Sequence, residues 1–143
     1  MKNMSDPDYA TDRLGLEVLT TDECWELVDA AAIGRVAFVD AGEPMVLPIT
    51  HSIDGHTVVF RSGRGTKLDA IESGRPLAFE VDAWDVTDRT GWSVLIRGTG
   101  AAVLDDEEIA RLGEHAAEPW LYEARVGTWL RLTPNEVTGR RLR

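Results

Sequence analysis

The chain has 143 residues, enough for one domain with its own hydrophobic core. Its composition, 43% hydrophobic and 28% charged, is that of a globular protein, and no apolar run is long enough to span a membrane. A formal net charge of −10 argues against nucleic-acid binding, and the single Cys24 excludes a disulfide framework or a cysteine metal cluster. No signal-peptide pattern opens the chain, so we expect a cytoplasmic protein with no membrane attachment.

Residues 1–18 mix Asp, Ser, Pro and Gly, which predicts a partly disordered N-terminal extension ahead of one domain over residues 19–143. Thr20 and Glu23 have the spacing of a capping box, so a helix is expected from there to about Ala31. Two further helices are expected, over 66–73 and from Asp105 to a point before Pro119.

The rest of the chain has strand periodicity. An Asp54-Gly55 pair predicts a tight turn, an acidic stretch over 82–90 predicts another, and Gly98 and Gly100 predict a bend or bulge. The six expected strands are 35–39, 44–51, 57–61, 77–81, 92–103 and 127–133, and 135–143 is expected to add an extended segment at a sheet edge. Six β segments with helices at intervals predict a mainly β fold, an antiparallel barrel with helical decorations.

A glycine-rich basic loop follows the strand 57–61. It contains three cations and two hydroxyls within seven residues: Arg61, Ser62, Arg64, Thr66 and Lys67. Glycines let a backbone approach a ligand closely, and cations and hydroxyls donate to anions, so the loop is a candidate phosphate site. Neither the Walker pattern nor the dinucleotide fingerprint is present. The alternative interpretation is a solvated loop with ordinary surface cations and Thr66 as a helix cap.

Charge is distributed unevenly along the chain. Residues 1–30 contain eight acidic residues against Lys2 and Arg13, whereas the C-terminal part is rich in arginine. The simplest interpretation is a pair of solvated faces on opposite sides of the domain.

Several stretches, taken together, resemble one family. They are Gly34 to Phe38, Pro44 to His51, Val59 to Ser62 with Thr66 to Leu68, and Gly91 to Gly98. In order and spacing these stretches resemble the pyridoxamine 5′-phosphate oxidase-like flavoproteins. The resemblance implies a six-stranded antiparallel split β-barrel of the FMN-binding type, and a homodimer with FMN in the cleft between subunits.

The resemblance also implies roles for individual residues. Arg61, Ser62, Thr66 and Lys67 match the grip on the FMN phosphate, which agrees with the loop found from its own chemistry. The strand beside the flavin ring is matched by Pro48, Ile49 and Thr50. The partner subunit's contribution near the ring is matched by Trp92 and Ser93.

The named activity of the family does not carry over, because the basic site for a substrate phosphate is absent and Thr50 replaces a longer amide side chain. We therefore expect a flavin-dependent oxidoreductase acting on a small molecule. A reductase using the deazaflavin F420, and a non-enzymatic carrier or sensor of flavin or haem, are the alternatives.

His51 is the one candidate for a catalytic side chain. Its position beside Thr50 suits a proton donor near a flavin or substrate. The competing interpretation, which we favour, is a histidine at the barrel rim that is hydrogen-bonded to backbone. No metal site is expected, because His51 and His56 have no carboxylate or thiol to complete a ligand set.

Overall fold

The computed structural model describes residues 11–63, 67–72, 74–116 and 127–143. Within these ranges the helices are α1 (Thr21–Ala30), α2 (Lys67–Glu72) and α3 (Asp106–His115). The strands are β1 (Glu17–Val18), β2 (Ile33–Asp40), β3 (Glu43–Thr50), β4 (Ser52–Asp54), β5 (Thr57–Ser62), β6 (Pro76–Asp85), β7 (Thr90–Ala102) and β8 (Thr128–Leu142). None of the described helices is long and apolar enough to cross a membrane.

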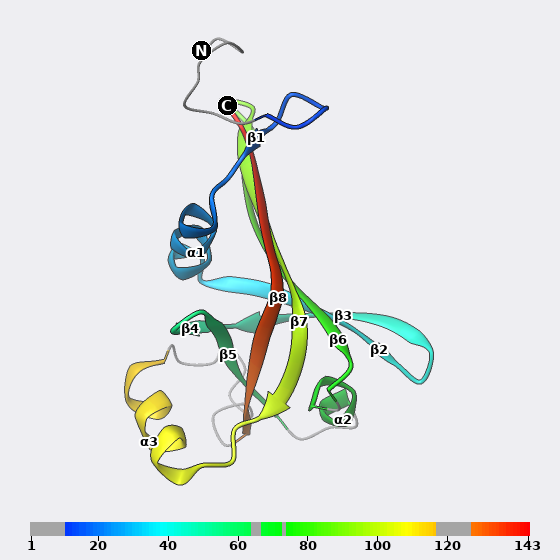
Figure 1. Ribbon diagram of the computed structural model, residues 1–143, viewed down its shortest axis with the longest axis vertical. Coiled ribbons are helices and arrows are strands. Elements are labelled where there is room, and N and C mark those ends of the chain that lie inside the picture. Colours follow the sequence, from blue (N-terminus) through cyan, green and yellow to red (C-terminus); the bar gives the residue numbers. More distant parts are fainter. Residues whose placement is uncertain (1–10, 64–66, 73, 117–126) are drawn as a thin grey trace.

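All strands belong to one antiparallel sheet in the order β3-β2-β6-β7-β8-β5-β4, and β1 pairs with the end of β8. The sheet curls strongly, so that β2 and β3 run across the direction of the long strands β7 and β8 (Figure 1). Strands β3 and β5 contact each other without forming a ladder, so the barrel is incomplete. This is the curled, open antiparallel sheet that the sequence predicts.

The predicted end of the strand 77–81 is wrong. The acidic stretch 82–90 is not all turn, because Ala83, Trp84 and Asp85 continue β6 opposite Trp92, Gly91 and Thr90. Cross-strand pairing there outweighs the low strand propensity of aspartate. The two-residue β1 and three-residue β4 are additions to the six predicted strands.

The segment 135–143 is not an edge strand. Residues 135–142 are the second half of β8, and β8 pairs with β7 from Leu130 to Leu142. The predicted bulge is present where the register shifts between Arg97 and Gly98, with Asn135 as the extra residue on β8. A Cβ at Gly98 would overlap the Thr133 carbonyl, so the close approach of the two strands at the bulge requires glycine.

The helices pack on the sheet through two apolar clusters. Helix α1 begins with the predicted capping box of Thr20 and Glu23, and its Cys24, Trp25 and Val28 are buried in the main core. Helix α3 covers a smaller cluster that contains Val59, Val103, Leu112 and Trp129. Each helix therefore buries one stripe of side chains against the sheet.

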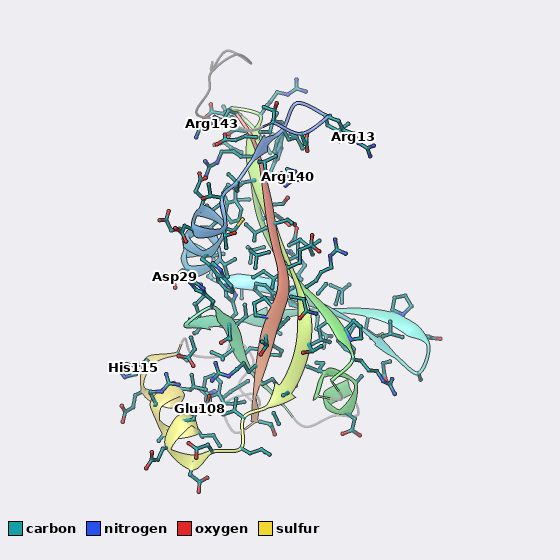
Figure 2. All side chains as sticks on the ribbon, in the orientation of Figure 1. Arg13, Asp29, Glu108, His115, Arg140 and Arg143 are labelled. Atoms are coloured by element: carbon teal, nitrogen blue, oxygen red, sulfur yellow. The ribbon has the colours of Figure 1, made fainter. Side chains whose placement is uncertain are left out.

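The acidic N-terminal part and the basic C-terminal strand end lie together, not on opposite sides as the sequence suggests. Glu17 bonds to Arg143 at 2.8 Å, and Asp12 bonds to Arg140 at 3.1 Å. Figure 2 shows Arg140 and Arg143 beside the N-terminal turn that carries Arg13, at the end of a projecting arm. Pairing of β1 with β8 produces this meeting, because it places opposite charges on adjacent strands.

Candidate functional site

The predicted phosphate loop begins where β5 ends. Arg61 and Ser62 are the last two residues of β5, and the backbone of Lys67 begins α2. Thr66 and the side chain of Lys67 lie outside the described residues. The structure therefore places the two ends of the loop as predicted.

Arg61 is held in a defined position. Its guanidinium carbon lies 4.7 Å from the centre of the Trp129 ring, and the two residues stand directly opposite each other in the ladder between β5 and β8. Ser62 donates from its hydroxyl to the carbonyl of Gly63 at 3.3 Å. A Cβ on Gly127 would overlap the Ser62 carbonyl, so the start of β8 lies directly against the beginning of the loop.

The predicted ring strand, β3, divides between two faces. Ile49 points into the core, where it is 9% exposed. Pro48 and Thr50 point outward, opposite Arg35 and Ile33 of β2. Only these two side chains of the three can reach a ligand on the outer face, so Ile49 could contribute there only through its backbone.

Trp92 and Ser93 lie on the arm formed by β6, β7 and β8. Ser93 is exposed on the outer face opposite Asp82 and Arg140, whereas Trp92 packs against the main core. By register Trp92 is next to Arg141, close to the C-terminus, which Figure 1 shows at the opposite end of the molecule from α2. One chain therefore does not bring Trp92 and Ser93 to the loop after β5.

His51 has the environment of a structural histidine. It is buried, its Nε2 lies 2.8 Å from the Val28 carbonyl in the last turn of α1, and its ring meets Phe79 edge-on with centroids 4.9 Å apart. Burial lowers the pKa of His51, and the bond to Val28 and the charge of Asp29 only partly oppose this effect. The ring is neutral with Nε2 as the donor, which fits the interpretation favoured from the sequence.

A family model described as pyridoxamine 5′-phosphate oxidase matches residues 20–141. The chain belongs to this family. An uncharacterized protein of Mycobacterium tuberculosis is 32% identical over 129 residues, 87% of this chain and 84% of that protein.

Solved structures of similar proteins share the fold. An FAD-binding protein of Mycobacterium smegmatis is 34% identical over 88% of this chain and 98% of its own, with a TM-score of 0.74. A Corynebacterium glutamicum protein, provisionally named a pyridoxamine 5′-phosphate oxidase, is 28% identical over 89% and 98%, with a TM-score of 0.76. The predicted family and its split β-barrel are confirmed.

Two features of this family member were missed from the sequence. The first is the contact of Trp129 with Arg61, two residues that are 68 positions apart along the chain and are brought together only by the β5–β8 register. The second is Glu80, which shares an outer-face hollow of about 340 Å³ with Arg35 and Asp82. Burial, with the hydrogen bond and charge of Asp82, raises the pKa of Glu80 to about 7, against the opposing charge of Arg35. Alternation along β6 could have grouped Glu80 with Asp82, but not with Arg35.

Among the described residues, no three His, Cys, Asp or Glu side chains gather as a metal-binding set. The cations near the site come from different elements: Arg61 from β5 and Arg131 from β8. Arg131 is engaged by Asp54, Thr57 and Glu108, which tie α3 to the hairpin of β4 and β5. Hydrogen bonds from Arg111 and then Arg131 lower the pKa of Asp54 to about 2, so Asp54 is ionised at neutral pH.

Proposed function

We propose that this family member binds a flavin nucleotide, FMN, with the flavin phosphate at the end of β5. The observation that carries the proposal is the position of Arg61 and Ser62 at the strand end, where the chain enters a loop rich in glycine, cations and hydroxyls. The guanidinium of Arg61 has several N–H donors and the side chain of Ser62 has a hydroxyl, and both kinds of group donate hydrogen bonds to phosphate oxygens.

The backbone is closely packed at this strand end. Gly63 begins the loop, and a Cβ on Gly127 would overlap the Ser62 carbonyl, so the start of β8 requires glycine there. The relative from Mycobacterium smegmatis, 34% identical, is described as FAD-binding. Since FAD contains the riboflavin 5′-phosphate unit, this relative supports a flavin in general, and FMN and FAD both need to be titrated.

We also propose a homodimer in which one subunit's arm reaches the other's ring strand. Three candidate ring contacts face outward: Pro48 and Thr50 of β3 and Ser93 of β7. However, Ser93 lies on the arm, whereas the end of β5 lies towards the opposite end of the molecule (Figure 1). A twofold axis through the outer face is one way to bring these groups together. Each flavin ring would then be contacted by residues of both subunits.

The bound flavin would supply the redox chemistry of an oxidoreductase acting on a small molecule. In this proposal the protein binds and orients the ring. Arg61 holds the phosphate, and the outward side chains of β3 leave one side of the cleft for a substrate.

The first test identifies whatever copurifies with the protein. Absorbance of the purified protein and mass analysis of the released small molecule are expected to show a flavin. A deazaflavin or haem would instead support one of the two alternatives predicted from the sequence. Oxidation of NADH or NADPH by the loaded protein would distinguish an enzyme from a carrier.

The second test locates the phosphate. Replacing Arg61 by glutamine is expected to weaken FMN binding about tenfold, because a charge-assisted hydrogen bond contributes roughly 1.5–3 kcal/mol. Riboflavin, which has no phosphate, should bind the native and variant proteins alike. The measurement is a fluorescence titration with FMN, FAD and riboflavin.

Arg13→Gln is the matched control, since it removes one positive charge at the far end of the molecule. Equal losses for FMN and riboflavin in the Arg61 variant would mean that Arg61 acts through the fold. Unchanged FMN binding would place the phosphate elsewhere.

A further inference from the structure

The guanidinium of Arg61 lies over the indole ring of Trp129. The 4.7 Å separation between the guanidinium carbon and the ring centre is within the range of a cation–π contact. Direct pairing of the two residues between β5 and β8 sets the separation of their backbones. The guanidinium of Arg61 is therefore attracted to the indole ring of Trp129. As a result, the long side chain of Arg61 loses much of its rotational freedom before any ligand binds.

Trp129 is itself immobilised. Its side chain is 6% exposed and packs with Val59, Val103 and Leu112 in the cluster covered by α3. Its backbone carbonyl accepts a hydrogen bond of 2.8 Å from the Val103 amide. Val59 of β5, Val103 just after β7 and Leu112 of α3 therefore hold the indole of Trp129 in place.

A guanidinium over an aromatic ring uses its face for the ring, whereas its N–H donors point outward in its own plane. We propose that Trp129 is a positioning residue for the cofactor phosphate, which holds Arg61 so that its donors are already oriented when the phosphate binds. The proposal rests on flavin binding at the end of β5. It also gives α3 a role, since Leu112 of this helix packs in the same buried cluster as the indole.

The chemistry of the proposal separates two properties of Trp129. Its volume fills the cluster under α3, and any large apolar side chain provides that. Its π face attracts a cation, and leucine lacks this property, while phenylalanine and tyrosine keep it in weaker form. A role in positioning must therefore affect the ligand that contacts Arg61, and a role in packing must affect all ligands.

The experiment titrates FMN and riboflavin into native protein and the variants Trp129→Leu, Trp129→Phe and Trp129→Tyr. The leucine variant is expected to bind FMN about three- to tenfold more weakly, with the aromatic variants between it and native protein. Riboflavin affinity is expected to stay the same throughout. If the leucine variant fails to fold, the order Trp above Tyr and Phe for FMN, with riboflavin unchanged, decides the question.

A double-mutant cycle with Arg61→Gln shows whether Trp129 acts through the arginine. In the Arg61→Gln background, replacing Trp129 should cause no further loss of FMN affinity. Val28→Ala serves as the packing control, because it removes a fully buried side chain from the main core and leaves the cluster that holds the indole untouched. This control should lower thermal stability and keep the native ratio of FMN to riboflavin affinity.

Three results would overturn the inference. Equal loss for both flavins means that Trp129 only fills space, and equal loss in both Arg61 backgrounds means that it acts on the ligand by another route. Full FMN affinity in the leucine variant removes any role. Native protein that binds neither flavin would instead refute the proposed function, and the inference with it, before any variant is compared.

Discussion

His51 joins two elements that are separate in the sequence. Its Nε2 donates to the Val28 carbonyl, one of the carbonyls in the last turn of α1 that have no partner within the helix. A charged imidazole in this buried position would lose its hydration, which is why burial lowers the pKa of His51. The histidine therefore links the end of α1 to the residue that follows β3, and burial favours its neutral form.

This histidine predicts a dependence of stability on pH. The unfolded chain takes up a proton on His51 near the ordinary value of 6.5, and the folded chain does so only at a lower pH. The contribution of His51 to the free energy of unfolding is fully present above pH 6.5, the unfolded value. It is lost as the pH falls from there towards the lowered pKa of the folded state. Urea unfolding from pH 7.5 downward should show a smaller loss of unfolding free energy for His51→Gln than for native protein. Parallel profiles for both proteins would contradict this.

At the scale of elements, the contact between α1 and β8 depends on one missing side chain. Gly139 lies beneath the helix, and a Cβ there would stand 2.7 Å from the sulfur of Cys24 and 2.9 Å from a methyl group of Leu19. Both neighbours are buried, so they have little room to move. The absence of a Cβ lets α1 lie directly on the strand.

Replacing Gly139 by alanine is therefore expected to cost about 1–3 kcal/mol of unfolding free energy through overpacking. The cost should be smaller in a Cys24→Ala background, because the atom nearest to the new methyl group is then gone. Chemical denaturation of the native protein, both single variants and the double variant measures this coupling. An unchanged cost in the two backgrounds would place the strain elsewhere.

At the scale of the whole molecule, the outer face of the sheet carries charges of both signs beside exposed valines. Strand register puts Pro48, Arg35, Glu80, Leu95 and Thr138 in one row, and Val46, Ala37, Ala78, Arg97 and Glu136 in the next. Val39 and Val46 are 51% and 59% exposed on this face. Arginines (Arg35, Arg97, Arg140) and acids (Glu80, Asp82, Glu136) are interspersed there, and Glu80, with a pKa of about 7, is only partly charged at neutral pH. A second copy would meet a partly apolar surface with charges of both signs here, which suits the proposed homodimer.

We expect Val46→Asp to weaken the homodimer without unfolding the subunit, because it adds a charge to an exposed position. Leu104→Asp is the control, since Leu104 is 81% exposed in the connection before α3, away from this face. Sedimentation velocity at micromolar concentration should show dissociation for Val46→Asp alone. A native protein that is a monomer would refute the dimer, and equal effects of both variants would place its interface elsewhere.

The sequence by itself determined the elements whose signals are local. Alternation of apolar residues placed the six main strands, and Thr20 with Glu23 placed the start of α1. Gly98 marked the bulge, and the Arg61–Ser62 end of the loop came from residue chemistry. These features depend on neighbours within a few residues, so a linear pattern can carry them.

The tertiary structure alone decided what depends on strand register. It continued β6 through the acidic stretch, merged 135–143 into β8, and paired the two oppositely charged ends of the chain. It also placed Trp129 under Arg61 and Glu80 beside Arg35. In an antiparallel sheet these contacts are made between residues far apart in sequence, and a shift of one position would turn every side chain to the other face, so composition and periodicity do not specify them.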